Sequence, residues 1–345
     1  MNNQMQLYSL VKKLYQANLW EDYWDNDIIG IQLPDRKDPV FISILGKAEQ
    51  NFGILIYRNL EELSYFFETS KRVEDREFSS VMEVLQTRKC ISLDFEDRQE
   101  IPKEEYEKIK ASGITFRGKK AWPVFTDYKP GYYPYMIDES DVPFLIAIFE
   151  KLVETANDFR NSLQLYEQEQ SIYKMLMRTY KKDGLYEDSF YTVPEVVLEG
   201  LLDNEIDHAP IKLTEFEMRR ANNQKMKNTI WELDIDFIGV PVVPAGGGRP
   251  IFPCLLIVAD TKDGEIICSE FIKLRDIEKI QRIVIQLILA QNGRPPKIVI
   301  DADRHLKIAV YLEKLLTALD IELVPIQKLP LLSVAKQDML EYFED

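Results

Sequence analysis

The first 156 residues alternate between apolar runs and short polar loops, and the spacing of the apolar residues predicts an α+β domain. Apolar residues recur at helical spacing between Leu7 and Tyr15, which predicts a helix with one buried face. Three strands are predicted next, separated by polar loops of hairpin length, over 27–33, 39–46 and 52–59. The remaining elements are predicted as helix, strand, helix, strand and helix, with the two strands at 89–99 and 121–128.

Residues 157–228 are more polar and mix helical with extended patterns. The stretch up to Asp183 and Gly184 is predicted as one polar helix, followed by a strand that Pro194 interrupts. A short amphipathic helix is predicted over 214–227. Aromatic and aliphatic residues are too frequent here for a disordered linker, so we expect a connector that packs on the flanking domains.

Residues 229–345 give the clearest pattern. Three strands come first, and the tight-turn pair Asp263 and Gly264 joins the second strand to the third. Helix, strand, helix, strand and a closing helix follow, which completes the order βββαβαβα. Right-handed crossovers then place the fourth and fifth strands parallel to the first. This is the ribonuclease H-like topology, so the predicted fold class is α/β with mixed sheets and a ribonuclease H-like domain over 229–345.

The N-terminal part reads in the same element order, from 27 to 156. Gly30 on the first strand and Asp94 on the fourth are separated by about as many positions as Asp234 and Asp301 in the C-terminal part. We therefore predict two copies of one topology joined by a helical connector, with the N-terminal domain a divergent copy of the ribonuclease H-like domain. The alternative is that three hairpin strands followed by αβ units are simply a common α+β order.

Composition and charge narrow the class of protein. The chain has 345 residues, 46% hydrophobic and 29% charged, which is typical of a globular protein, and no apolar run approaches the roughly 18 residues that span a bilayer. Three widely spaced cysteines without a C-x-x-C pair, and an N-terminus without signal-peptide order, predict a cytoplasmic location. Two histidines leave little for a His-rich zinc site or a Ser-His-Asp triad.

The net charge of −15 makes this an acidic protein, and a uniformly acidic surface opposes non-specific binding to nucleic acid. The densest basic stretches are 116–120 and 218–227, which are either docking patches or solvated faces. The tyrosine-rich stretch 127–136 is either a recognition surface or packing of a link. The glycines of 245–250 neither open a helix nor precede a Lys-Ser/Thr pair, so they predict a hairpin loop rather than a phosphate cradle.

The candidate chemistry lies in a row of carboxylates on the first C-terminal strand. Glu232, Asp234 and Asp236 share one parity, so they line one face of that strand. Strands one and four are neighbours in the predicted topology, which brings Asp301 and Asp303 to the same edge. Mg²⁺ or Mn²⁺ prefers such hard oxygen ligands, and two-metal phosphoryl transfer needs three or four of them. The alternative is that the row is only the solvated face of a strand.

Several long motifs resemble a bacterial family built from two domains of unknown function in tandem. The stretches that carry the resemblance are "IQLPDRKDPVFISILGKAEQNFGILIYRNLEEL", "YKPGYYPYMID", "WELDIDF", "GRPIFPCLLIVADTKDGEI" and "GRPPKIVIDADRHLKIAVYLEKLL". The resemblance covers most of the chain, and the family implies no established activity.

The C-terminal part is also similar to the catalytic core of integrases and transposases. The matching features are Trp231 with Asp234, Asp260 with Gly264, Arg294 to Pro296, and Asp301 or Asp303. This chain departs from that pattern because no Asn-Gly follows the second aspartate. Only Asp338 and Glu341 are available as a carboxylate on the closing helix. The second ligand is therefore ambiguous, and Ala302 matches the second position as well as its acidic neighbours do.

Two functions follow from these observations. The first is a non-catalytic interaction or scaffold module with a degenerate ribonuclease H-like domain, which binds protein and needs no cofactor. The second is a nuclease or other phosphoryl-transfer enzyme that depends on Mg²⁺ or Mn²⁺, with Asp234, Asp236, Asp301 and Asp303 as ligands. Asp338 or Glu341 would then be the last ligand, and nucleic acid would bind only with the metal. His305 next to Asp303 is either a proton shuttle or a helix-capping residue.

Overall fold

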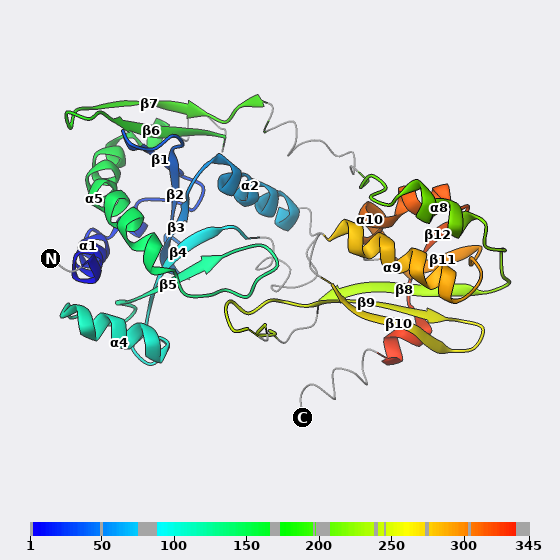
Figure 1. The fold of residues 1–345 in the computed structure, drawn as a ribbon. Helices are drawn as coiled ribbons and strands as arrows, with labels where there is room; N and C mark the ends of the chain where they lie inside the picture. The colour runs from blue at the N-terminus through cyan, green and yellow to red at the C-terminus, as the bar shows by residue number, and fades with distance from the viewer. Residues whose placement is uncertain are drawn as a thin grey trace. The chain divides into compact units, whose positions relative to one another are not determined.

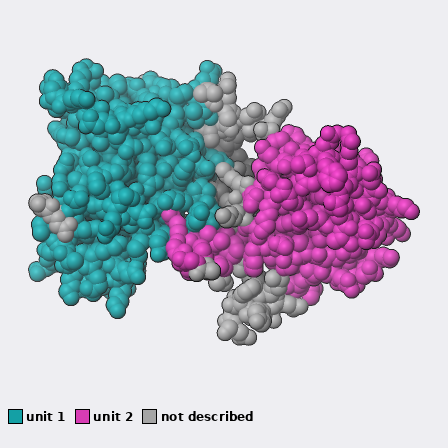
Figure 2. Space-filling view, viewed as in Figure 1, with its two compact units in different colours: residues 1–202 teal, residues 203–345 magenta. Residues whose placement is uncertain are grey.

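The chain forms two compact units, Met1–Leu202 and Asp203–Asp345, each coloured separately in Figure 2, and each contains one mixed β-sheet (Figure 1). The structure is a computed structural model, and it describes residues 3–48, 51–74, 88–165, 173–195, 197, 208–237, 241–244, 246–272, 276–302 and 305–335. The predicted mixed α/β class is confirmed by the two sheets. No described helix combines the length and apolar composition needed to cross a membrane.

The first unit is a seven-stranded sheet with helices on both faces. Its strands are β1 Ile29–Gln32, β2 Val40–Leu45, β3 Phe52–Tyr57, β4 Cys90–Glu96, β5 Trp122–Tyr128, β6 Lys174–Tyr180 and β7 Tyr186–Thr192. Its helices are α1 Asn3–Gln16, α2 Leu60–Glu74, α4 Lys103–Ser112 and α5 Val142–Phe159, with short 3₁₀ turns at Leu19–Glu21, Glu139–Asp141 and Arg160–Ser162.

The apolar face of each helix determines which side of the sheet it covers. The helices α1 and α5 bury Leu7, Val11, Leu145 and Phe149 against one face of β1 to β3, and α2 buries Leu63 against the other face (Figure 1). Asp138 and Asp141 form a reciprocal capping box that opens the 3₁₀ turn Glu139–Asp141, and this turn leads directly into α5. Strands β2 and β3 are therefore buried on both faces, which explains their continuous apolar sequence.

An ionic cluster around Arg58 connects the edge of this sheet to the first turn of α2 and to the start of α5. The guanidinium of Arg58 contacts the carboxylates of Glu62 (3.1 Å), Asp127 (3.2 Å) and Asp141 (3.2 Å). Asp127 is only 1% exposed and also pairs with Lys129. These carboxylates raise the pKa of Arg58 although burial itself lowers it. Arg58 therefore holds α2, β5 and the start of α5 together.

The prediction that the N-terminal part copies the C-terminal topology is wrong. The strand order is β5-β4-β3-β2-β1-β6-β7, and β4 pairs antiparallel with β3. Asp94 consequently lies opposite Gly53, far along the sheet from Gly30 on β1. The parallel neighbour of β1 is β6, which comes from the stretch predicted as a polar helix.

Within that stretch the helical prediction also fails over β6. Met175 and Met177 alternate onto one face and are buried with Phe41 of the sheet, so an extended chain buries them better than a helix. The unit boundary at 202 places β6 and β7 with the first unit, whereas the sequence pattern separated a connector over 157–228 from the domains 1–156 and 229–345.

The second unit has a five-stranded sheet between helices. Its strands are β8 Ile230–Phe237, β9 Cys254–Asp260, β10 Glu265–Ile272, β11 Lys297–Asp301 and β12 Glu322–Ile326, and its helices are α8 Glu215–Asn222, α9 Ile277–Ala290 and α10 His305–Ala318. Local signals start these helices: Thr214 and Glu217 form a capping box for α8, and the Asp276 carboxylate accepts from the Lys279 N–H at the start of α9.

The sheet order is β10-β9-β8-β11-β12, with β8, β11 and β12 mutually parallel and the other pairs antiparallel. This is the topology predicted from the sequence for residues 229–345, and it is confirmed. The helices α9 and α10 cover one face, where Trp231 and Leu233 of β8 are buried (Figure 1).

Candidate functional site

The acidic row of β8 lies on the face of the second sheet opposite α9 and α10. Register places Glu232 beside Ala259, Asp234 beside Ile257 and Asp236 beside Leu255 of β9. A separate apolar cluster covers this face, in which Leu255, Ile257 and Ala259 pack with Leu329 and Leu332 of the chain after β12. Glu232 and Asp234 are only 2% and 3% exposed. The row is therefore not the solvated side of the strand.

Glu232 caps a helix that begins about a hundred residues further along the chain. Residues 330–335 are helical, and the Ser333 N–H donates to the Leu329 carbonyl at 2.9 Å, which makes Leu329 the N-cap residue. A leucine side chain cannot accept the free N–H groups of the first turn. The Glu232 carboxylate accepts them instead, from Leu331 at 3.0 Å and from Leu332 at 2.9 Å.

This role of Glu232 was missed by sequence reasoning, which treated the residue only as a member of the row. One signal was available: "KLPLLS" starts a helix with Pro330 but supplies no Ser, Thr, Asp or Asn before it. The first N–H groups of a helix without its own cap bond to water or to an acceptor from elsewhere in the fold, and apolar neighbours favour the second.

Asp234 and Asp301 occupy neighbouring positions on adjacent parallel strands. Cα register pairs Val299 with Glu232, so continuing two residues along both strands places Asp301 next to Asp234 on the same face. Asp301 and Asp236 are half-buried. The Asp234 Oδ1 atom accepts from the Ile235 N–H at 2.9 Å. The topology thus brings together two of the four predicted ligands, with Asp236 two residues further along β8.

The other predicted ligands do not complete a site in the part of the chain that the structure describes. Asp303, Asp338 and Glu341 lie outside the described residues, and His305 is the first residue of α10. Among the described residues no three His, Cys, Asp or Glu side chains are grouped so that they could hold a metal ion. Two neighbouring carboxylates suit a hard divalent cation chemically, but they are fewer than two-metal catalysis needs.

Asp260 has a structural role in the turn that follows β9. Its Oδ1 atom accepts from the Lys262 N–H at 2.9 Å and from the hydroxyl of Thr229, and its carbonyl accepts from the Gly264 N–H at 2.9 Å. These bonds close the turn between β9 and β10, where Gly264 has φ +73°. The aspartate that corresponds to the second integrase-like motif is therefore committed to a turn.

Burial disfavours the thiolate form of all three cysteines. All three are free thiols. Burial, reinforced by the neighbouring Asp236 carboxylate, raises the pKa of Cys254 to about 12, and burial likewise raises the pKa of Cys90 to about 12 and that of Cys268 to about 11. A thiol with so high a pKa stays protonated at neutral pH and is unreactive.

The glycine-rich stretch forms a loop, as predicted. Val242 and Ile251 pair as an antiparallel bridge across it, and Gly247 and Gly248 have φ of +77° and +104°. In the described part of the chain nothing lies within 4 Å of a Cβ built at either glycine.

Two solved structures are similar to the chain at a low level. One is a chain of the Mos1 strand transfer complex, 13% identical with a TM-score of 0.18, and the other belongs to a pre-cleavage Mos1 transpososome, 11% identical with a TM-score of 0.17. The alignments cover 78% of this chain in both cases, and 78% and 79% of the other chains. At these TM-scores the likeness carries no argument about fold or function.

No curated protein matches the chain. Two family descriptions do match: residues 5–178 fit the domain of unknown function DUF7309, and residues 217–340 fit the domain of unknown function DUF6930. The two matches fall in the first and second compact units respectively. Because the first match spans half of the chain, the protein belongs to the DUF7309 family and carries a DUF6930 domain in tandem.

Proposed function

We propose that the protein is a non-catalytic interaction module whose second unit uses its acidic row to fix the C-terminal helix rather than to bind metal. The observation that carries this proposal is the buried Glu232 carboxylate, which accepts the N–H groups of Leu331 and Leu332. The low exposure of Asp234 also supports it, because a metal-dependent site must be open to its substrate.

The partner in this proposal is an extended segment of another protein, bound along the edge strand β7. Six of the seven β7 residues are exposed, and β7 is the last strand of the first sheet. The Lys181 N–H donates to the Leu185 carbonyl (2.7 Å), and the Val193 N–H donates to the Tyr173 carbonyl (2.9 Å). These bonds show that the odd-numbered residues of β7 are the ones whose backbone groups bond to β6. By that alternation Tyr186, Asp188, Phe190 and Thr192 direct their N–H and C=O groups away from β6.

Such a row of outward backbone groups is what an added strand pairs with. The strand is tied to β6 by side-chain contacts: the Arg178 guanidinium, itself 1% exposed, pairs with Asp188 at 2.7 Å and stacks on Tyr186 at 3.8 Å. The net charge of −15 favours encounter with a basic segment. We therefore assign β7 to a basic, extended peptide.

Display of random ten-residue peptides against the full chain tests this assignment. Enriched peptides should be basic and should bind the wild type and Phe190→Ala equally, because the side chain is not required. They should fail to bind Phe190→Pro, which removes an outward N–H without removing a bond of the β6–β7 ladder. Equal binding to Phe190→Pro, or no enrichment at all, would refute strand addition at β7.

A second candidate function is divalent-metal-dependent phosphoryl transfer, and the adjacency of Asp234 and Asp301 on parallel strands favours it. In that case these two residues would hold the metal with Asp236 and Asp303, and the metal would clamp the attacking and leaving oxygens. The full chain should be incubated with single-stranded and duplex DNA and RNA in Mg²⁺ and in Mn²⁺. Cleavage that disappears in Asp234→Asn supports the enzyme, and no cleavage above that of Asp234→Asn supports the interaction module.

A further inference from the structure

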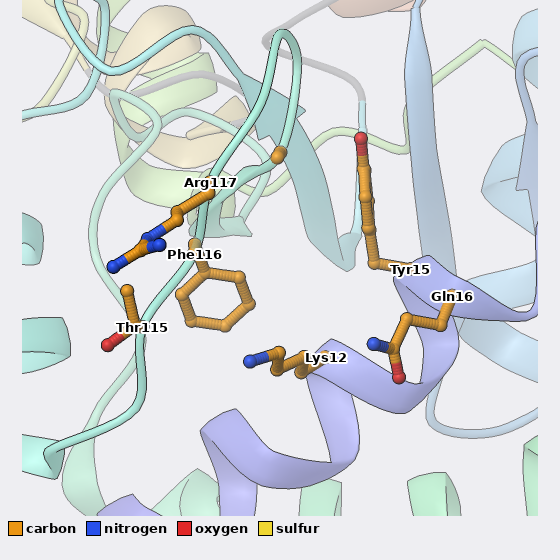
Figure 3. Close-up of a pocket in the computed structure, with 7 residues that line it drawn as sticks. Lys12, Tyr15, Gln16, Thr115, Phe116 and Arg117 are labelled. Carbon is orange, nitrogen blue, oxygen red and sulfur yellow. The ribbon is translucent and has the colours of Figure 1, made fainter.

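The first unit contains a pocket of about 310 Å³ between α1 and the segment 115–121, and none of its residues belongs to the acidic row. Figure 3 shows α1 facing the segment that leads into β5. The lining residues are Lys12, Tyr15 and Gln16 from α1, and Thr115, Phe116, Arg117 and Ala121 from that segment. The volume is at the lower end of the range for small-molecule sites.

The pocket carries positive charge that is not neutralised locally. Two of its lining residues are cations and none is a carboxylate. Within the described part of the chain neither Lys12 nor Arg117 forms an ion pair, whereas nearby Lys120 pairs with Glu96 and with Glu100. In a chain with a net charge of −15, two such cations at one hollow concentrate positive potential there.

The wall that carries Arg117 is fixed in place. Lys120 adopts a left-handed backbone conformation with φ +48°, and its N–H donates to the Asp97 carboxylate at 2.8 Å while its ammonium pairs with Glu96. On the other side, the Tyr15 hydroxyl donates to the Lys119 carbonyl at 3.3 Å. A site held in this way before binding loses little conformational entropy when a ligand arrives.

Two aromatic residues line the pocket beside the charges, and of these Tyr15 is the one with an accessible ring. Phe116 is 3% exposed and packs edge-on against Tyr8, with ring centroids 6.3 Å apart. Tyr15 is half-buried, and its ring lies 5.1 Å from that of Phe95. Phe116 therefore supports the wall from the core, and the accessible part of the Tyr15 ring can contact a planar group of a ligand.

We propose that this pocket binds a small phosphate monoester that carries a flat ring. A phosphate monoester has nearly two negative charges at neutral pH and three acceptor oxygens. Lys12 supplies a point charge, Arg117 supplies a planar fork of donors, and Gln16 and Thr115 supply neutral donors. A single carboxylate has half the charge and fewer acceptors, so it satisfies fewer of these groups.

Calorimetric titration of the full chain with phenyl phosphate tests the proposal. Lys12→Ala and Arg117→Ala should each weaken binding at least tenfold, since hydrogen bonds to a charged group are the strong ones. Lys13→Ala is the matched control, because Lys13 is exposed and is the next residue of the same helix but does not line the pocket. Unchanged binding in both pocket variants, or no binding to the wild type at millimolar concentration, would overturn the proposal.

Three further ligands separate the contribution of the ring from that of the phosphate and test for an acidic protein segment. Inorganic phosphate should bind more weakly than phenyl phosphate, and equal affinity would remove the ring from the proposal. Benzoate should also bind more weakly, and tighter binding would reassign the site to carboxylates. A glutamate-rich peptide that displaces phenyl phosphate at lower concentration would make the pocket a docking site for an acidic protein segment, which overturns the small-molecule assignment. The result is independent of the proposed role of the acidic row, which lies in the other unit.

Discussion

Replacing Glu232 with alanine should destabilise the second unit, because the side chain connects β8 to the C-terminal helix. The carboxylate is 2% exposed and accepts from two backbone N–H groups at 3.0 Å and 2.9 Å. Alanine removes the acceptor and leaves both donors at the first turn without a partner in a covered location. It also leaves a space beneath Leu332, which is fully buried.

The magnitude follows from the two bonds. A hydrogen bond to a charged group contributes about 1.5–3 kcal/mol, whereas an exposed N-cap contributes about 1 kcal/mol. Burial places Glu232 nearer the first value, and the two bonds share one carboxylate, so we expect a loss of about 3 kcal/mol for Glu232→Ala. Glu232→Gln keeps one carbonyl acceptor of the same shape and should lose about 1 kcal/mol.

Denaturant titration followed by hydrogen-exchange mass spectrometry measures this loss, with β9 and β11 peptides reporting on the second unit alone. Glu265→Ala is the matched control, because Glu265 is an exposed carboxylate on the edge strand β10 of the same sheet. The amides of Leu331 and Leu332 should lose protection in the Glu232 variants and keep it in the control. A Glu232→Ala variant within about 0.5 kcal/mol of the control would refute the capping role.

Two further predictions concern the charges and thiols of the fold. Arg58→Ala should destabilise the first unit by about 3 kcal/mol in denaturant titration, because it leaves partly buried carboxylates without their shared cation, and a loss below about 1 kcal/mol would contradict that role. Burial raises the pKa of Cys90 and Cys254 from 9.0 to about 12. Between pH 9 and pH 12 each thiol ionises in the unfolded chain but stays protonated in the folded chain. The free energy of unfolding should therefore be unaffected by these thiols below pH 9 and should fall above it by about 1.4 kcal/mol per pH unit for each thiol. Unfolding of Cys90→Ala at pH 8 and pH 10 should show a smaller pH dependence than the wild type, and an equal dependence would refute the shift.

The sequence predicted the second sheet well because its connections leave few arrangements. Three hairpin-linked strands and two crossover helices determine the order once right-handed crossovers are assumed. The first sheet differs because β4 is antiparallel to β3, and the crossover rule does not apply to antiparallel strands. The sequence pattern does not show whether the strand after the three-stranded meander pairs with β1 or with β3. The predicted ribonuclease H-like order placed β4 next to β1, but that position is taken by β6.

In the candidate site, the features set by local sequence were predicted and those set by distant residues were not. Alternation along β8 predicted correctly that Glu232, Asp234 and Asp236 share a face, and the topology predicted that Asp301 lies near them. The cover over that face comes from Leu329 and Leu332, about a hundred residues away, and alternation contains no information about it. Sequence reasoning therefore found the carboxylates but could not predict that two of them are buried.

We propose that the acidic row supports the fold rather than a metal site, and Mn²⁺ binding to the full chain is the sharpest test of this role. Titration of the wild type and of Asp234→Asn by calorimetry should give the same weak, millimolar binding for both proteins. Micromolar binding to the wild type that Asp234→Asn abolishes, while the variant retains wild-type folding by circular dichroism, would exclude a purely structural acidic row and favour the metal-dependent enzyme.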